Sequence, residues 1–216
     1  MLIEPIRNLF SRGVVVKAGV PGSIAEDVLP AELEPMAGVH PRRHLEFVAG
    51  RSLARQGLRE LGVASFVLLS DSKRAPIWPA GISGSITHKP ELCVVVVAPM
   101  SRARSLGIDA EPEDELKTEL WKAVLDSQET AAVARLPDPG VAARIMFSAK
   151  ESIYKCQYPI TRQYLGFHDV HLEMDWGARR FNCLMPESVA GEVGGSMTGS
   201  WCVSAGHIVT AVEFRG

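Results

Sequence analysis

The chain has 216 residues, of which 46% are hydrophobic and 22% charged, with a formal net charge of −2. This length suits one large domain or two small ones, and the slight acidity argues against nucleic-acid binding, which needs a basic surface. No apolar run approaches the roughly 18 residues of a membrane span, and the start lacks the basic and apolar regions of a signal peptide. We therefore expect a cytoplasmic protein that does not enter membranes.

The first half of the chain predicts one long helix among strands and loops. In chain order we expect a strand with irregular connections in 14–40, a helix over 43–61, a short strand over 65–70, a loop over 71–84 and a buried strand over 92–98. The helix is indicated by apolar residues that recur on one face and by Gly62, which follows as a stop signal.

The second half predicts helices followed by strands. We expect a strand over 105–111, a helix over 113–125, a short helix that Asp126 and Glu129 begin as a capping box, a helix over 141–158, and strands over 167–174, 178–184, 199–205 and 208–214. This order favours an α+β fold with antiparallel sheets over a doubly wound parallel sheet. The four scattered cysteines have no Cys-x-x-Cys pair, which predicts buried free thiols.

Two acidic clusters lie about forty residues apart. Asp109 and Glu111 alternate, so on a strand they point to one face. Glu151 and Lys155 are four residues apart, so on a helix they share one face. Three carboxylates that meet suit a hard cation such as Mg²⁺, and a lysine beside such a cation suits a phosphorylated substrate. Each cluster alone also fits a solvated strand edge or a surface ion pair.

Four stretches in order resemble the 4′-phosphopantetheinyl transferases of the larger, two-lobed (Sfp- and enterobactin-type) class. They are Arg43 through Gly50-Arg51-Ser52-Leu53-Ala54-Arg55, then Ala75-Pro76-Ile77-Trp78-Pro79 with Gly84-Ser85-Ile86-Thr87-His88, then Gly107-Ile108-Asp109-Ala110-Glu111-Pro112, and Phe147-Ser148-Ala149-Lys150-Glu151 with Tyr154-Lys155. The last two motifs, with their order and separation, are the specific part. Pro159-Ile160-Thr161 leading to Leu165-Gly166-Phe167 is similar to actinobacterial members.

The resemblance implies a fold of two similar lobes, a pseudo-dimer in which each lobe is an antiparallel sheet packed with a long helix. The active site would lie in the cleft between residues 1–104 and residues 105–216. The implied reaction moves the 4′-phosphopantetheine arm of coenzyme A to a serine hydroxyl of an apo acyl, aryl or peptidyl carrier protein, for fatty-acid, polyketide or nonribosomal-peptide synthesis. It releases adenosine 3′,5′-bisphosphate. Two lobes in one chain predict a monomer.

The resemblance also assigns roles to residues. Asp109, Glu111 and Glu151 would hold Mg²⁺, or Mn²⁺ in its place, against the pyrophosphate of coenzyme A. Glu151 would serve either as a metal ligand alone or also as the base that takes the proton of the attacking serine, directly or through a water; metal ligation would weaken it as a base because ligation lowers its pKa. Lys155 would pair with the transferring phosphate. The residues expected to contact coenzyme A phosphates are Arg43, Arg51, Lys73, Arg74, Thr87, His88, Lys150 and Lys155.

Two other functions fit parts of this pattern. One is a metal-dependent phosphohydrolase that uses the same carboxylates with water as the acceptor for a nucleotide pyrophosphate. The other is a coenzyme A-binding protein without catalysis. The pairing of 147–155 with Gly-Ser-Ile-Thr-His argues against a hydrolase, and the complete set of carboxylates with Lys155 argues against a passive binder. We further expect the segment 121–135 to border the cleft and to meet the carrier protein.

Overall fold

The computed structural model describes residues 3–216 and has the predicted α+β architecture with two antiparallel sheets. Its helices are α1 (Ile3–Arg7), α2 (Pro30–Leu33), the 3₁₀ turn η1 (Glu34–Met36), α3 (Pro41–Glu60), α4 (Thr118–Val124), α5 (Ser127–Val133), α6 (Pro139–Thr161) and α7 (Glu187–Val193). Its strands are β1 (Val15–Gly19), β2 (Ile82–Lys89), β3 (Leu92–Pro99), β4 (Ser105–Pro112), β5 (His171–Asp175), β6 (Arg180–Leu184), β7 (Ser196–Ser204) and β8 (His207–Phe214).

The first lobe is a three-stranded sheet in the order β1-β3-β2, with α3 on one face. Helix α3 begins with Pro41 in its first turn, where a missing N–H costs nothing. Its residues Ala49 and Leu53 pack against Val95 and Val97 of β3. Strand β3 is buried on both faces, which explains why its sequence is a continuous apolar run rather than an alternating one.

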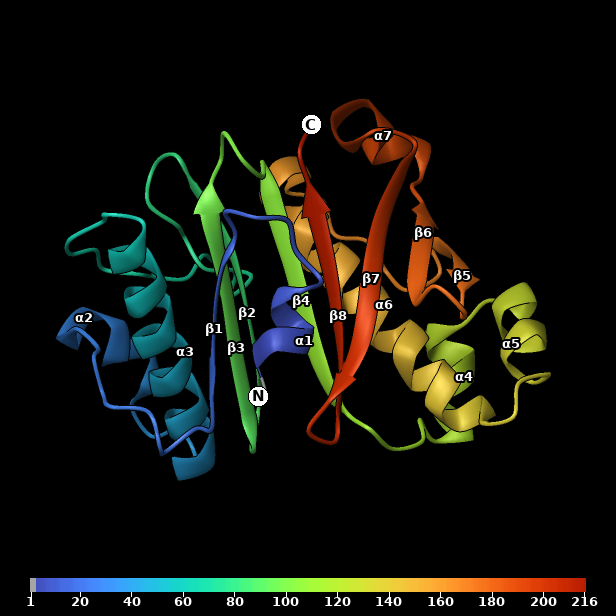
Figure 1. Cartoon of the computed structure of the whole chain (residues 1–216), viewed down its shortest axis with the longest axis horizontal. Coiled ribbons are helices and arrows are strands. Elements are labelled where there is room, and N and C mark those ends of the chain that lie inside the picture. The colour runs from blue at the N-terminus through green and yellow to red at the C-terminus, as the bar shows by residue number, and fades with distance from the viewer. Residues whose placement is uncertain (1–2) are drawn as a thin grey trace.

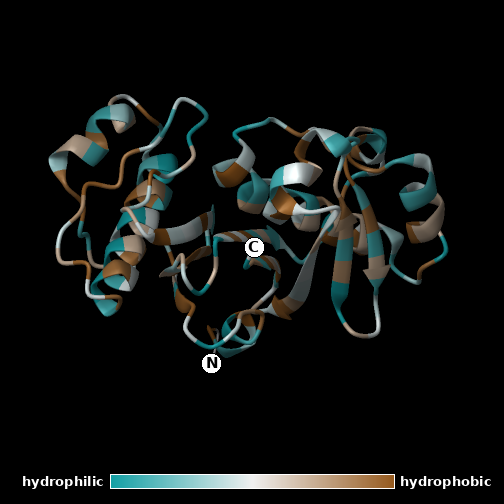
Figure 2. Ribbon diagram, turned by 90° about the horizontal axis from the view of Figure 1, so that it is seen from above, coloured by the Kyte–Doolittle hydropathy of each residue, from teal (hydrophilic) through white to brown (hydrophobic). Residues whose placement is uncertain are grey.

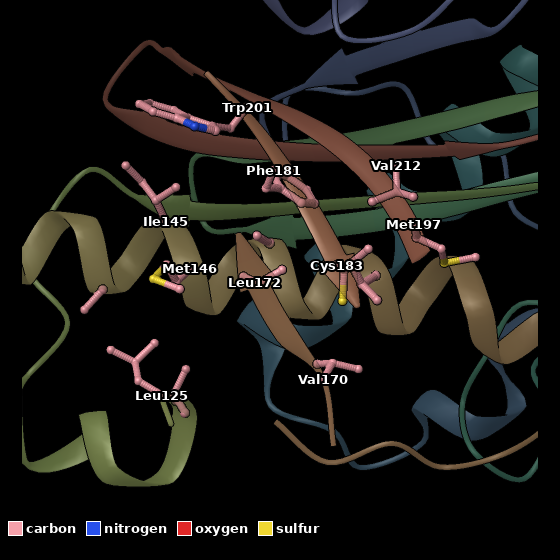
Figure 3. Packing of buried hydrophobic residues seen from close by; sticks show 14 of the residues in the cluster. Leu125, Ile145, Met146, Val170, Leu172, Phe181, Cys183, Met197, Trp201 and Val212 are labelled. Carbon is pink, nitrogen blue, oxygen red and sulfur yellow. The ribbon is translucent and has the colours of Figure 1, made fainter. Parts of the chain in front are cut away.

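The second lobe is a five-stranded sheet in the order β4-β8-β7-β6-β5, with α6 behind it in the view of Figure 1. Figure 3 shows how this core fills: Ile145 and Met146 of α6 meet Phe181 and Leu172 from the sheet. Helices α4 and α5 lie at the outer edge of this lobe, away from α3 (Figure 1). Each lobe is therefore an antiparallel sheet with one long helix, although the sheets differ in size.

Strands β2 and β4 lie side by side where the two sheets meet. The backbone N–H of Ile108 donates to Ser85 Oγ at 3.1 Å, and that of Ala110 donates to Thr87 Oγ1 at 3.1 Å. Side-chain hydroxyls thus satisfy β4 donors that a neighbouring strand would otherwise bond. On the far side of this seam, Ile6 of α1 packs into a core that draws from both sheets (Figure 1). Seen from above, the C-terminus lies between the two halves (Figure 2).

Several elements differ from the sequence-based expectations. The predicted strand over 65–70 is wrong, since only Ser70 forms an isolated bridge, to Pro76. The backbone of this segment bonds instead to a buried ion pair: Leu68 N–H donates to Glu32 at 2.7 Å, and Arg55 donates to the Phe66 carbonyl at 2.7 Å. The helix predicted from residue 113 begins only at Thr118, and α1 and α7 were not predicted.

Two further expectations, on the cysteines and on the capping box, are confirmed within residues 3–216. Cys93, Cys156, Cys183 and Cys202 are free and buried. The capping box at Asp126 forms, with both reciprocal hydrogen bonds to Glu129 in place. Every helix of the described chain is too short or too polar to cross a bilayer. The two sheets separate at residues 100–104, and we propose this link as the boundary between the lobes.

Candidate active site

Strand β4 and helix α6 bring the two acidic clusters together. Asp109 and Glu111 alternate on β4 and are 4% and 6% exposed. Helix α6 lies so close to β4 that a Cβ at Gly107 would sit 1.9 Å from the Ser152 carbonyl oxygen. Glycine is therefore required at this position, and it allows Glu151 to approach the strand carboxylates.

Asp109 is held by hydroxyl and ammonium donors. Lys155 Nζ lies 2.7 Å from Oδ1, and Ser148 Oγ donates to Oδ2 at 2.8 Å. Ser148 is one turn before Glu151 on α6, and sequence reasoning gave it no role. Its hydroxyl also lies 3.0 Å from Thr210 Oγ1. The carboxylate of Asp109 is thus fixed in orientation from both sides.

Glu111 is held by two cations that sequence reasoning also missed. Lys89 Nζ lies 2.5 Å from Oε1, and Arg144 lies 3.3 Å from Oε2. Burial raises the pKa of Glu111, the Lys89 hydrogen bond opposes this, and the neighbouring charge of Asp109 adds to the rise. The only sequence signals for these cations are weak: Lys89 follows His88, and Arg144 stands two helical turns before Glu151.

Glu151 is the carboxylate without a direct partner. It is half-buried, and among residues 3–216 no hydrogen bond or ion pair reaches it. Burial raises its pKa, Lys155 opposes this, and the charges of Asp109 and Glu111 raise the pKa further. Three carboxylates therefore share one negative region with an uncompensated member. That donor set fits a hard divalent cation, which accepts carboxylate oxygens and retains waters.

These three carboxylates are nevertheless not a closed cluster. In the described chain, the group of three ligand-type side chains with atoms within 4.8 Å of one another is Asp126, Glu129 and His171. Each of these has a structural partner: Asp126 caps α5, His171 Nδ1 lies 2.5 Å from Asp126, and Glu129 bonds Lys150. Asp109, Glu111 and Glu151 do not meet this distance criterion as a group in the described chain.

Lys150 requires a correction. We expected it to contact a coenzyme A phosphate, but its side chain is 1% exposed and its ammonium is bonded within the second lobe. It lies 2.7 Å from Glu129 and donates to the carbonyl oxygens of Val124, Phe167 and Val170. These partners use all the donors of an ammonium. Lys150 therefore holds α5 and the start of β5 against α6.

Thr87 requires a second correction. Its side chain was expected to donate to a phosphate, but the residue is 3% exposed. Its hydroxyl accepts from the Ala110 N–H and donates to Asp109 Oδ1 at 3.3 Å. Thr87 thus serves the seam between the lobes and the orientation of Asp109.

A continuous cleft runs between the lobes. One cavity of about 200 Å³ is lined by Glu151, Lys155 and Tyr154 from α6 and by Lys73 and Arg74 from the loop after Ser70. It shares Arg74, Pro76 and Ile86 with a cavity of about 580 Å³ beside α3. On its other side it shares Glu151 and Tyr154 with a smaller, largely apolar cavity of about 140 Å³. Glu151 therefore lines two of these adjoining cavities.

Neither a larger cavity nor the segment 121–135 belongs to the three cleft cavities. The larger cavity, of about 770 Å³, is on the second sheet around Arg180 and Glu213 and shares no residue with the cleft. No residue of 121–135 lines any of the three cleft cavities. These cavities give no support to the expectation that the segment borders the cleft, which stays a prediction, and α4 and α5 lie at the outer edge of the second lobe (Figure 1).

Arg51 is a buried cation in the cavity beside α3. It is 5% exposed, its guanidinium lies over the Phe47 ring with 4.5 Å to the centroid, and it donates to Ser70 Oγ at 2.9 Å. Its Nε has no hydrogen-bond partner within residues 3–216. Burial lowers its pKa to about 10, so it stays charged at neutral pH. A buried donor of this kind is costly unless a ligand satisfies it.

His88 lies at the opposite wall of the same cavity, between Arg43 and Glu46. Arg43 contacts the imidazole, and Glu46 lies 3.2 Å from Nδ1. Burial and then the charge of Arg43 lower the pKa of His88 to about 4, against an opposing effect of Glu46. His88 is therefore neutral at physiological pH and offers a neutral N–H or a lone pair, not a positive charge.

The loop residues Lys73 and Arg74 complete the basic wall. Arg74 lines both the cavity of about 580 Å³ beside α3 and the central cavity of about 200 Å³, and Lys73 lines the central one. Within the described chain, neither side chain has a hydrogen-bond or ion-pair partner. Arg43, Arg51, Lys73 and Arg74 thus all face one cavity system, as their predicted roles require.

Comparison with known families agrees with this geometry. Residues 31–98 match the model of the 4′-phosphopantetheinyl transferase N-terminal domain, and residues 105–202 match that of the 4′-phosphopantetheinyl transferase superfamily. The two matches lie on either side of the link between the sheets.

Curated relatives cover most of the chain. The chain is 32% identical to the 4′-phosphopantetheinyl transferase PptT of Mycobacterium tuberculosis, over 93% of this chain and 98% of the relative. It is 37% identical to the transferase Svp of Streptomyces mobaraensis, over 86% and 78% of the two chains. Enterobactin synthase component D of Salmonella typhimurium is 41% identical over a shorter region, 53% of this chain and 48% of the relative.

The chain folds into two antiparallel sheets with a charged cleft between them, and family models match both halves. Together these findings define an enzyme that transfers a phosphopantetheinyl group. The chain belongs to the 4′-phosphopantetheinyl transferase superfamily. The reaction expected from the four motifs, transfer of the phosphopantetheine arm of coenzyme A to a carrier protein, is the activity of this family.

Proposed function

We propose that this enzyme is a Mg²⁺-dependent holo-carrier-protein synthase whose reaction takes place around Glu151. The observation that carries the proposal is the position of Glu151, an unpartnered carboxylate that lines the central cavity and is close enough to Asp109 and Glu111 for their charges to raise its pKa. A phosphohydrolase or a passive coenzyme A binder remains the alternative. The basic cavity beside α3 and the smaller, largely apolar cavity lined by Glu151 favour a substrate with a phosphate end and an apolar arm.

Asp109, Glu111 and Glu151 would hold Mg²⁺, with Mn²⁺ as a substitute. The bound cation would neutralise charge on the pyrophosphate as the anhydride breaks. Lys155 and Lys89 already lie within 2.7 Å of Asp109 and Glu111, respectively. We propose that both lysines turn toward phosphate oxygens when the substrate enters, because their carboxylate partners then gain another cation.

The transfer step forms one P–O bond and breaks another. The serine oxygen of the carrier attacks the phosphorus next to the pantetheine arm, and the bond to the nucleotide phosphate breaks to release adenosine 3′,5′-bisphosphate. The serine proton must leave as this happens. Glu151 is the proposed acceptor, directly or through a water, since among residues 3–216 its carboxylate has no hydrogen-bond or ion-pair partner. Lys155 would stabilise the transferring phosphate.

The nucleotide end of coenzyme A would lie in the cavity beside α3. Arg51 offers an unpaired Nε there, Arg43 and Arg74 offer guanidinium groups, and Lys73 offers an ammonium near the central cavity. His88 would contribute a neutral N–H. The pantetheine arm would lie in the apolar cavity beyond Glu151, lined by Ile153, Leu165 and Phe167.

Acyl, aryl or peptidyl carrier proteins are the proposed acceptors. We also propose that the enzyme acts as a monomer, since both lobes that form the cleft come from one chain. Four buried free thiols agree with a reducing compartment, so we keep the cytoplasmic localisation expected from the sequence.

Mass spectrometry of an apo-carrier protein tests the proposal. After incubation with the enzyme, coenzyme A and Mg²⁺, the carrier should gain the mass of one phosphopantetheine group, and adenosine 3′,5′-bisphosphate should appear in equal amount. Nucleotide release without carrier modification would favour the hydrolase. Binding of coenzyme A without either product would favour the passive binder.

A further inference from the structure

The loop that carries Lys73 and Arg74 is organised by one carboxylate. Asp71 Oδ1 accepts from the backbone N–H of Lys73 and of Ala75, both at 2.9 Å. The Asp71 N–H donates to the Ala75 carbonyl at 2.9 Å, and the Arg74 N–H donates to the Asp71 carbonyl at 2.9 Å. Asp71 therefore closes a compact turn on its own backbone, as aspartate side chains do in tight turns.

This turn has an unfavourable backbone conformation. Arg74 has φ of +66°, in the left-handed region that side chains other than glycine rarely adopt. Such a conformation is unfavourable and persists only where surrounding contacts enforce it. The four hydrogen bonds centred on Asp71 are those contacts. Held in this turn, Arg74 lines the wall of the cavity beside α3.

The other oxygen of Asp71 reaches the second lobe. Asp71 Oδ2 accepts from Tyr158 OH at 3.2 Å and from Arg162 at 3.1 Å, at the end of α6. Arg162 has a left-handed φ of +56° and lies with its guanidinium 5.6 Å from the Tyr158 ring centroid. Tyr158 in turn stacks on Tyr154, which lines the cavity around Glu151. One carboxylate thus ties the phosphate-binding loop to the helix that carries Glu151.

The charge of Asp71 is unexpected where it lies. Asp71 lines the same cavity as Arg43, Arg51 and Arg74, in which a polyanionic nucleotide is proposed to bind. A carboxylate there repels phosphates, so its presence requires a benefit that outweighs this repulsion. A contribution to folding stability is a weak explanation for Asp71 at this place, because its ion-pair partner Arg162 is 62% exposed and exposed ion pairs contribute little. Positioning of the basic loop accounts for both the location and the bonding of Asp71.

We propose that Asp71 is a positioning residue for coenzyme A: it fixes the 71–75 turn to the end of α6, so that Lys73 and Arg74 face the phosphates at a set distance from Glu151. The inference rests on the proposed binding of the nucleotide beside α3. Asp71 does not touch the reacting atoms, so its loss should weaken coenzyme A binding and leave the chemical step intact.

The test measures binding and turnover separately. For Asp71→Ala, the calorimetric Kd and the KM for coenzyme A should rise about tenfold or more, the size of one or two lost charge–phosphate contacts. The kcat should stay within about twofold. Asp71→Asn keeps an oxygen for the two loop N–H donors and should fall between wild type and Asp71→Ala. The double variant Tyr158→Phe with Arg162→Ala leaves Asp71 in place and should reproduce at least part of the rise, even if Asp71→Ala fails to fold.

Asp175→Ala is the matched control. Asp175 also accepts a backbone N–H in a turn, from Ala178 at 2.9 Å, but it lies outside the cleft, so coenzyme A binding should be unchanged. An unchanged Kd for both Asp71→Ala and the double variant would overturn the inference, as would a fall in kcat at constant KM. Failure of the wild-type enzyme to bind coenzyme A would instead overturn the proposed function.

Discussion

Lys155 Nζ lies 2.7 Å from Asp109 Oδ1 and donates to the Ile108 carbonyl at 3.2 Å, so a lysine of α6 spans the gap to β4. Its charge also opposes the rise in the pKa of Glu151, one turn earlier on the same helix. Lys155 therefore serves two carboxylates and borders the central cavity at the same time.

Replacement of Lys155 should mainly slow the chemical step. For Lys155→Ala we expect kcat to fall about 100-fold or more, as for the loss of one charge-stabilising group in an active site, with a smaller change in KM for coenzyme A. Steady-state kinetics with an apo-carrier protein measure both. Lys122→Ala, on the exposed face of α4, is the control. A rise in KM alone would make Lys155 a binding residue only.

Metal removal should stop the transfer. Chelator should abolish activity of the wild type, and added Mg²⁺ should restore it. Asp109→Asn should require at least about tenfold more Mg²⁺ for half-maximal rate, because it loses one ligand charge. Calorimetric titration of Mg²⁺ gives the same comparison without turnover. The exposed Glu119→Gln serves as control, and full activity of Asp109→Asn in chelator would contradict the proposed metal site.

Arg51 should distinguish coenzyme A from its 3′-dephospho form. We expect Arg51→Ala to raise KM for coenzyme A by about 10–100-fold, the range for a lost charge-assisted hydrogen bond. The penalty should be smaller for 3′-dephospho-coenzyme A, because a lost contact matters only where the phosphate exists. Arg51→Lys keeps the charge but loses Nε and the flat contact with Phe47, so its KM for coenzyme A should fall between those of wild type and Arg51→Ala. Equal penalties for both ligands would place the 3′-phosphate nearer Arg43 or Lys73.

His88 should make stability depend on pH in the acid range. Its pKa is about 4 in the folded protein and 6.5 by default, so the unfolded chain binds more protons between these values. The free energy of unfolding should therefore fall as the pH drops from about 6.5 to 4 and stay unaffected above that window. His88→Gln removes this contribution.

Thermal unfolding at pH 7.5 and pH 5 measures the difference between His88→Gln and wild type. We expect the wild type to lose several degrees more than the variant on acidification. The comparison of the two proteins cancels the other titrating groups. Equal losses would mean that His88 is protonated in the folded state.

Lys150 should matter for stability instead of substrate binding. Lys150→Met leaves Glu129 buried without its cation, and we expect a loss of about 3–5 kcal/mol in the free energy of unfolding. Urea unfolding measures this loss. Adding Glu129→Gln should recover part of it, since the uncompensated charge is then gone. Unchanged stability together with a raised KM for coenzyme A would reinstate Lys150 as a phosphate ligand.

The two lysines of α6 illustrate what the sequence predicts and what it does not. The motif identifies Glu151 and Lys155 because the four-residue spacing fixes a shared helix face. Lys150 lies beside Glu151 in the chain, but its direction depends on which face of α6 the second sheet covers, and that is decided by tertiary packing. The contacts of Lys89 and Arg144 with Glu111 could not be predicted for the same reason, since each cation reaches Glu111 from another element. The local sequence of the 65–70 segment predicts a strand, but its backbone bonds instead to the buried Glu32–Arg55 pair, which comes from elsewhere in the chain.

The hydroxyl bonds between β2 and β4 have a consequence for solubility. Each of these strands is at the edge of its sheet, and exposed edges are templates for pairing with other chains. Because β2 and β4 lie side by side, neither edge is free to pair with a second molecule. The valine-rich β3 is the next strand after β2 in the first sheet. Wide separation of the lobes would break these bonds and expose both edges at once, so a closed seam protects the protein against pairing with other chains.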